Sequence, residues 1–241
     1  HVIGVDLHDQ AAPELVDSGL FTQVVGGVDQ DATWAIVRDH LDVMAEDASV
    51  GLAHCAAMLV QGRVEDVSRE SWEKILAVNV VGAANAMKAV TPAMERHGSG
   101  SIVLVGSVSG FLGEEAMLAY GTSKGAVLQM TRAGALDYGR RLIRVNSVSP
   151  GPMATEMFFV HMRAAPDPEA FLKRRESRQP LGFVLEPRQV ANAIAFFLSD
   201  ASSGITGVNL PVDAGLTAGF EFRNLDMGDR DSHYEGKDDS K

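Results

Sequence analysis

The chain has 241 residues, of which 46% are hydrophobic and 22% are charged, and its formal net charge at pH 7 is −11. This composition is that of an ordinary globular domain and excludes collagen-like and disordered chains. The acidic charge argues against a nucleic acid or an anionic membrane as partner, because both require a basic surface. The single cysteine, Cys55, excludes an intrachain disulfide framework and a cysteine-rich zinc site, so we expect no metal and a reducing, cytoplasmic setting.

Short β-type runs alternate with longer helical patterns along the chain. Strands are predicted at residues 2–7, 23–28, 50–56, 101–105, 144–149 and 208–212. Helices are predicted at residues 31–47, 72–96, 118–140 and 187–198. This alternation is typical of an α/β fold in which a doubly wound parallel sheet carries helices on both faces, in three layers.

The chain is expected to form a single domain over residues 1–218. Residues 153–185 are less regular and rich in methionine and charge, and residues 219–241 form a charged tail that we expect to be extended or partly mobile. The longest apolar run, at residues 50–60, is interrupted by His54 and is far shorter than the ~20 residues of a membrane span. We therefore expect no membrane partner.

The strongest local signal for chemistry is the pair Tyr120 and Lys124. Residues four apart on a helix lie on one face, so the Lys124 ammonium is expected near the Tyr120 phenol. A neighbouring cation stabilises phenolate, which lowers a tyrosine pKa by ~1–3 units and suits the phenol to proton transfer. The alternative is a surface helix with a packed tyrosine and a solvated lysine.

Two further polar positions follow predicted strands. Ser107 comes directly after the strand at residues 101–105, and Ser149-Pro150-Gly151-Pro152 ends the next one. In open parallel sheets, ligands bind beyond the carboxyl ends of the strands, which is where a reactive hydroxyl should be. The alternative for both positions is ordinary turn chemistry.

Together these residues resemble the short-chain dehydrogenase/reductase family, whose fold is Rossmann-like. The resemblance covers the chain from Val2 to about Ala218. It is carried by the combination, in order, of Asn79, Ser107, Tyr120, Lys124, Pro150-Gly151, Thr155 and the closing segment at residues 205–215.

The resemblance implies a role for each residue of the candidate site. Tyr120 would be the general acid or base, and Lys124 would lower its pKa and bond the nicotinamide ribose. Ser107 would bond the substrate oxygen and stabilise the charge developing there. Asn79 would hold a water that links Lys124 to solvent, and Thr155 would bond the nicotinamide carboxamide.

The same resemblance implies NAD as the cofactor. Asp6 ends the first predicted strand, where a carboxylate can accept hydrogen bonds from both adenosine ribose hydroxyls and repel a 2′-phosphate. The alternative is that Asp6 only caps the next segment. The cofactor-contacting residues implied by the resemblance are Asp6, Leu7, Val28, Asp29, Cys55, Ala56, Ala57, Tyr120, Lys124, Pro150, Gly151, Met153 and Thr155.

The sequence departs from the family pattern at three places. The glycine-rich phosphate loop, with its strand and helix, should precede His1, so we expect an omitted N-terminal strand–loop–helix unit of ~25–30 residues. The family's Asn-Asn-Ala-Gly segment is replaced by His54-Cys55-Ala56-Ala57, which bears on cofactor affinity rather than on chemistry. The adenine-contacting aspartate aligns with Gly27, and Asp29 is its candidate substitute.

The substrate is predicted to be a small molecule, a secondary alcohol or ketone. By resemblance, residues 153–185 are a lid whose methionines and phenylalanines favour a bulky apolar skeleton of steroid or terpene type. The lid also carries a basic cluster, which is either a solvated face or a site for an acidic subunit or an anionic group: Arg163, Lys173, Arg174, Arg175 and Arg178.

Two other functions stay open, and the family implies a homo-oligomer. One alternative is a reductase of carrier-bound or CoA-bound 3-oxoacyl groups, and the other is a non-catalytic nucleotide-binding relative. The predicted helices at residues 72–96 and 118–140 would pair across a two-fold axis into a homodimer or homotetramer.

Overall fold

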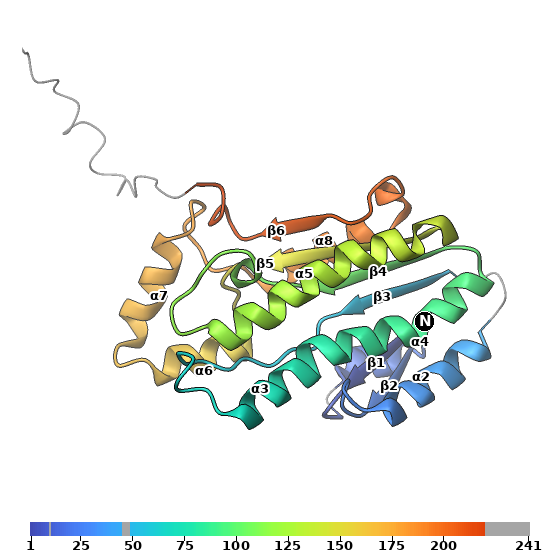
Figure 1. The fold of residues 1–241 in the computed structure, drawn as a ribbon, viewed down its shortest axis with the longest axis horizontal. Coiled ribbons are helices and arrows are strands. Elements are labelled where there is room, and N and C mark those ends of the chain that lie inside the picture. Colours follow the sequence, from blue (N-terminus) through green and yellow to red (C-terminus); the bar gives the residue numbers. More distant parts are fainter. Residues whose placement is uncertain (10, 45–48, 220–241) are drawn as a thin grey trace, which may run out of the picture.

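The computed structural model describes residues 1–9, 11–44 and 49–219 (Figure 1). Its strands, all at or close to predicted positions, are β1 Val2–Asp6, β2 Phe21–Val25, β3 Val50–His54, β4 Gly100–Val105, β5 Ile143–Pro150 and β6 Asn209–Val212. Its α-helices are α1 Pro13–Asp17, α2 Asp31–Asp42, α3 Arg69–Leu76, α4 Gly82–Arg96, α5 Leu118–Tyr138, α6 Glu156–Ala164, α7 Pro168–Ser177 and α8 Pro187–Leu198.

Three helical features differ from the sequence prediction. The five-residue helix α1 was not predicted, because a single turn has no repeat that a sequence pattern can reveal. Helix α2 ends at Asp42, and part of the predicted continuation to residue 47 lies outside the described residues. The predicted helix at residues 72–96 begins at Arg69 and contains a π-helical turn, Ala77–Val81, between α3 and α4.

The predicted tail at residues 219–241 lies outside the described residues apart from its first residue. The irregular segment at residues 153–185 contains α6 and α7, each preceded by a side chain that caps its first turn: Thr155 for α6 and Asp167 for α7.

The strands are all parallel, and helices cover both faces, which confirms the three-layer α/β class. The order in the larger sheet is β3-β4-β5-β6. Helices α4 and α5 pack on one face of this sheet and α8 packs on the other. The residues of β4 are buried on both faces, as expected for a central parallel strand: Ile102 and Leu104 face the main core cluster, and Val103 faces the cluster under α8.

In the described structure the strands form two separate sheets, a pair and a set of four. Strands β1 and β2 pair only with each other in the described structure. A cavity of about 830 Å³ separates β1 from β3, and Val5 and Leu52 are among the residues that line it. Each of these two strands therefore has a strand neighbour on one side and the cavity on the other.

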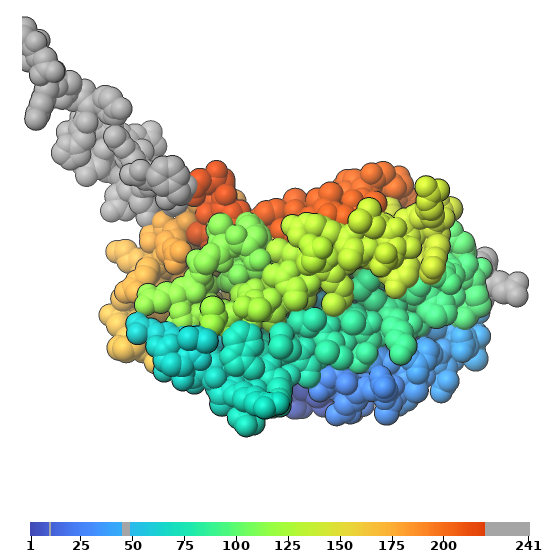
Figure 2. Space-filling model, viewed as in Figure 1, coloured from blue at the N-terminus to red at the C-terminus, as the bar shows by residue number. Residues whose placement is uncertain are grey.

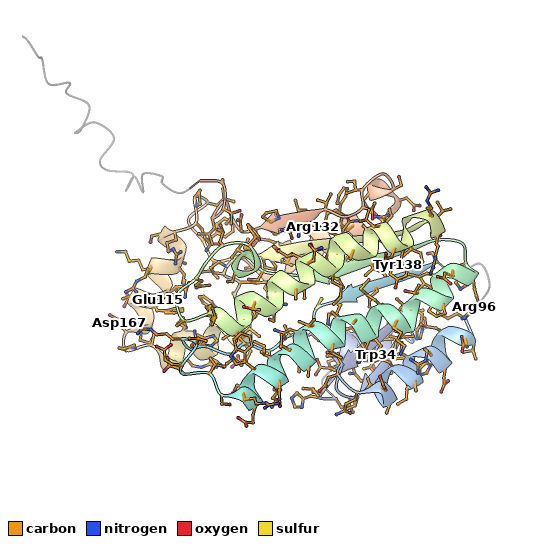
Figure 3. All side chains as sticks on the ribbon, in the orientation of Figure 1. Trp34, Arg96, Glu115, Arg132, Tyr138 and Asp167 are labelled. Carbon is orange, nitrogen blue, oxygen red and sulfur yellow. The ribbon has the colours of Figure 1, made fainter. Side chains whose placement is uncertain are left out.

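Helix packing, rather than strand pairing, attaches the β1–β2 pair to the rest of the fold. Helix α2 packs along α4, as the adjoining blue and green surfaces in Figure 2 show. Trp34, labelled in Figure 3, is buried on α2 and donates from Nε1 to the Val28 carbonyl at 2.7 Å. At the far end, Arg96 of α4 donates to Asp42 of α2 at 2.7 Å.

The helical stretch from Arg69 to Arg96 is long and apolar enough to cross a membrane by length and composition. However, half of the most apolar 18-residue segment of this stretch is buried inside the fold. Its residues Ala86, Met87 and Met94 belong to the main core cluster. The apolar character of this stretch is therefore accounted for by packing against the sheet.

Candidate active site

Ser107 lies between the end of β4 and a short 3₁₀ turn, Val108–Gly110. Its backbone is extended, and its Oγ accepts a hydrogen bond from the Ser109 N–H at 3.2 Å. The side chain is buried. Because the Oγ accepts from the turn, the hydroxyl proton of Ser107 is free to be donated elsewhere.

Tyr120 and Lys124 lie on one face of α5, in its first two turns. The Lys124 Nζ is 5.8 Å from the centroid of the Tyr120 ring. The same ammonium is almost completely buried and donates to the Val105 carbonyl, at the end of β4, at 2.8 Å. Ser107, Tyr120 and Lys124 together line one cavity of about 310 Å³.

Burial dominates the electrostatics of this cluster. It raises the pKa of Tyr120, and the Glu114 carboxylate raises that pKa further, while a hydrogen bond with Ser107 lowers it. The expectation that Lys124 leaves Tyr120 with a lowered pKa is therefore wrong in this structure, because removing the phenolate from water costs more than its neighbours return. Burial also lowers the pKa of Lys124 to about 8.

Glycines allow the Ser107 turn to lie directly on the backbone of α5. A Cβ at Gly110 would be 2.9 Å from the carbonyl carbon of Lys124, and a Cβ at Gly121 would be 2.8 Å from the Ser109 oxygen. Real Cβ atoms essentially never come this close to backbone. The sequence analysis missed this interface, whose only sequence signal is glycine at both positions.

Asn79 lies in the π-helical turn and acts here as a clamp. Its Oδ1 accepts from the Met58 N–H at 2.8 Å, and its Nδ2 donates to the Met58 carbonyl at 2.9 Å and to Ser123 Oγ at 2.9 Å. Ser123 in turn donates to the Tyr120 carbonyl at 2.7 Å. Asn79 is thus connected to α5 through Ser123. The water link from Asn79 to Lys124 stays a prediction.

The residues expected to contact a dinucleotide fall into two groups. Those that share the 310 Å³ cavity with Tyr120 and Lys124 are Cys55, Ala57, Pro150, Gly151, Met153 and Thr155. Those that line the 830 Å³ cavity between β1 and β3 are Asp6, Val28, Cys55 and Ala56. Cys55 lines both cavities, so they adjoin at this residue. Leu7 and Asp29 line neither of the two.

His54, at the end of β3, is the most perturbed of the histidines that the structure describes. It is 6% exposed, and its Nε2 makes no hydrogen bond within the described part of the chain. Burial and the charge of Lys124 lower the pKa of His54 to about 4. The imidazole is therefore neutral at physiological pH. It packs in the interior with one ring nitrogen, Nε2, lacking a hydrogen-bond partner among the described residues.

Five polar side chains of the 310 Å³ cavity were not predicted as site residues: Gln61, Ser109, Glu114, His161 and Arg175. Arg175 had been assigned only to a basic cluster on the lid. These residues come from segments far apart in the sequence, and no local spacing connects them. Only the packing of α6 and α7 near the end of β4 brings them to one cavity.

Comparison with known proteins identifies the class. A family described as "Enoyl-(Acyl carrier protein) reductase" matches residues 5–217. The chain is 38% identical over 169 residues to 2-(S)-hydroxypropyl-CoM dehydrogenase 3 of Xanthobacter autotrophicus, covering 70% of this chain and 66% of that protein. It is 34% identical over 208 residues to trans-4-hydroxycyclohexanecarboxylate dehydrogenase of Sinomonas cyclohexanicum, covering 82% of this chain and 76% of that protein.

A solved structure gives the same result. The gluconate 5-dehydrogenase of Burkholderia cenocepacia J2315, solved in complex with NADP and tartrate, is similar with a TM-score of 0.77 and 27% identity, covering 86% of this chain and 80% of that one. The chain belongs to the short-chain dehydrogenase/reductase family, a class of NAD(P)-dependent enzymes that act on CH–OH groups.

The glycine interface predicts a catalytic defect without unfolding. In Gly121→Ala, the added methyl group pushes on the Ser109 oxygen and displaces Ser107 from Tyr120, so we expect kcat to fall about 10- to 100-fold. Gly113→Ala, in the loop that precedes α5, is the control, because its Cβ would meet nothing within 4 Å. Steady-state kinetics and melting curves of both variants test this, and wild-type turnover by Gly121→Ala would contradict it.

The lowered pKa of His54 predicts acid sensitivity. The unfolded chain binds a proton near pH 6.5 that the folded chain resists until about pH 4, so the free energy of unfolding falls as the pH drops through this window. The loss attributable to His54 is about 2 kcal/mol at pH 5 and about 3 kcal/mol in total. Urea unfolding at pH 8 and pH 5 measures it.

His54→Leu should lose less stability than the wild type between these two pH values, by about 2 kcal/mol. Its matched control is His8→Gln, a change at an exposed position. An equal acid loss in the wild type and in His54→Leu would show that His54 is not responsible.

Proposed function

We propose that the protein is an NAD(H)-dependent oxidoreductase that interconverts a secondary alcohol and a ketone. The observation that carries this proposal is the convergence of Ser107, Tyr120 and Lys124 on one cavity of about 310 Å³. A hydroxyl, a phenol and an ammonium at a single concave site supply a donor to the substrate oxygen, a proton-transfer group and a positive charge.

Tyr120 moves the proton. In the oxidation direction, its Oη takes the proton of the substrate hydroxyl while the carbon gives up its hydrogen as hydride; in the reduction direction it returns that proton to the oxygen. Its raised pKa keeps the phenol protonated, as the proton donor of ketone reduction must be, but also makes it a weaker acid than a solvent-exposed tyrosine. Ser107, whose Oγ accepts from the turn, directs its own proton toward Tyr120 or the substrate oxygen.

Lys124 supplies the nearby charge. Its pKa of about 8 leaves the ammonium largely protonated at neutral pH. Burial and the hydrogen bond to the Val105 carbonyl fix its position behind the Tyr120 ring. In this low-dielectric setting, the ammonium favours the phenolate more strongly than it would in water.

The site fits the nicotinamide end of a dinucleotide. Lys124 can bond a ribose hydroxyl, Thr155 can bond a carboxamide, and Pro150-Gly151 offer a backbone wall to a flat ring. When bound, the dinucleotide supplies the hydride acceptor or donor. The adjoining 830 Å³ cavity has the Asp6 carboxylate among the described residues that line it, but no lysine or arginine.

Asp6 supports NAD over NADP. It ends β1 at the rim of the larger cavity, and its Oδ1 accepts from the His8 N–H at 2.9 Å. The Asp6 carboxylate can also accept hydrogen bonds from the two ribose hydroxyls of an adenosine, and its negative charge repels a 2′-phosphate. The neighbouring gluconate 5-dehydrogenase was solved with NADP, so the two cofactors must be compared directly.

The cavity volume favours a small substrate. At about 310 Å³ it lies at the lower end of the ~300–1,000 Å³ range of small-molecule pockets, and a nicotinamide would share it. The steroid- or terpene-like skeleton predicted from the lid residues stays an alternative, since a 3-alpha-(or 20-beta)-hydroxysteroid dehydrogenase of Mycobacterium bovis is 33% identical over 214 residues. The named substrates of the two sequence relatives, a hydroxypropyl compound and a hydroxycyclohexanecarboxylate, support a compact alcohol.

A second candidate function is supported by a separate cavity. It has a volume of about 430 Å³, and its lining includes Arg178 together with Glu114 and Arg175, which also line the catalytic cavity. Such a basic extension suits a longer substrate, such as a carrier-bound or CoA-bound 3-oxoacyl group. Faster turnover of a 3-oxoacyl thioester than of small ketones would favour this candidate.

Tyr120→Phe tests the proposed function. Loss of the phenol hydroxyl should lower the oxidation of alcohols by ~10²–10⁴-fold, while dinucleotide binding persists. Tyr138→Phe is the matched control, since this tyrosine lies at the other end of α5 and contacts Arg141 instead. Absorbance of the nicotinamide across a panel of small alcohols measures turnover, and fluorescence titration measures binding. Binding without turnover in the wild type would favour a non-catalytic nucleotide-binding protein.

Asp6→Asn tests the cofactor preference. Removing the carboxylate charge should lower the ratio of kcat/KM for NAD over NADP about tenfold or more, because repulsion of the 2′-phosphate is lost. Asp9→Asn, at an exposed position three residues away, should leave the ratio unchanged. A wild-type enzyme that prefers NADP would disprove this assignment without affecting the role of Tyr120.

A further inference from the structure

An ion pair forms part of the wall of the catalytic cavity. Arg175 of α7 donates from Nη1 to Glu114 Oε1 at 2.9 Å. The two side chains are 23% and 27% exposed, which makes this the least exposed salt bridge in the part of the chain that the structure describes. Both residues also line the neighbouring 430 Å³ cavity, so the pair lies at the boundary between the two cavities.

The hydrogen-bonding capacity of the pair is uneven. Both Glu114 oxygens are engaged, Oε1 with Arg175 and Oε2 with the Ser109 hydroxyl at 2.9 Å. A guanidinium has five N–H donors, and within the described residues only Nη1 of Arg175 makes a hydrogen bond. The Arg175 guanidinium therefore still has N–H donors and a positive charge with which to bind an anion.

The guanidinium is held in place from a second direction. Its central carbon is 5.1 Å from the centroid of the Phe171 ring, and Phe171 packs against Phe158 with centroids 5.7 Å apart. Both phenylalanines line the catalytic cavity. A guanidinium that is stacked on an aromatic ring and anchored by a carboxylate loses little entropy when it binds another group.

We propose that Arg175 is a specificity-determining residue that binds a carboxylate, or an equivalent oxyanion, on a small hydroxy-acid or keto-acid substrate. The inference rests on the proposed function, because the reacting carbon is taken to lie against Ser107 and Tyr120. The apolar body of the substrate would lie between them and Arg175, against Phe158 and Phe171. Glu114 then serves to position Arg175, since a carboxylate bound there needs the guanidinium fixed in one orientation.

The competing explanation is a structural one. A pair that joins the loop before α5 to α7 could simply hold the lid helices in place. In that case, disrupting either partner would affect charged and neutral substrates alike. In the proposed arrangement, only Arg175 discriminates between them, and loss of Glu114 leaves the discriminating charge intact.

The experiment compares trans-4-hydroxycyclohexanecarboxylate with its uncharged carboxamide. The wild type should prefer the carboxylate, and Arg175→Gln should lower the ratio of kcat/KM for carboxylate over carboxamide about 10- to 100-fold, mainly through KM. Arg175→Lys should restore part of the ratio. Glu114→Gln, which loosens the guanidinium but keeps its charge, should lower the ratio less than Arg175→Gln does. Arg174→Gln, an exposed neighbour on α7, is the matched control.

A binding measurement separates this inference from the proposed function. Calorimetric titration with cyclohexanecarboxylate, which has no hydroxyl to oxidise, should give a dissociation constant about tenfold or more higher for Arg175→Gln than for the wild type. Weaker binding of this kind, with no turnover of either alcohol by the wild type, would support the anion site and sink the oxidoreductase proposal. No binding by the wild type, or equal losses on both substrates in Arg175→Gln and Glu114→Gln, would overturn the inference.

Discussion

The candidate site depends on one close contact between backbones. The turn that carries Ser107 rests on the first turns of α5, and the approach is possible only because Gly110 and Gly121 have no Cβ. This contact fixes the distance between the hydroxyl of Ser107 and the phenol of Tyr120, which come from different elements of the fold. Without it, the strand end and the helix would each still form, but their side chains would not share a cavity.

Removal from water is the common cause of the electrostatic features around this contact. Three groups are buried here: the Lys124 ammonium, the Tyr120 phenol and the His54 ring. In each, burial shifts the pKa in the direction that favours the neutral form. The charge of Lys124 additionally disfavours a proton on His54. Perturbed pKa values that cluster in this way are typical of functional sites.

The divided sheet gives the molecule two adjoining cavities of different character. The larger one lies between the facing edges of β1 and β3, while the smaller one is bounded by the end of β4, by α5 and by the helices α6 and α7. Cys55, one residue beyond β3, lines both. The proposed dinucleotide would extend from Asp6 in the larger cavity to Tyr120 in the smaller one.

The sequence by itself determined the order of strands and helices and the shared face of Tyr120 and Lys124, because strand and helix periods are local properties that neighbouring residues encode. It also determined that Ser107 follows a central strand. Only the tertiary structure decided that Asn79 hydrogen-bonds Met58 and that Glu114 meets Arg175 across 61 positions of sequence. The direction of the Tyr120 pKa shift was likewise decided there, because a pKa depends on every group that excludes water from the phenol and not only on the lysine four residues away.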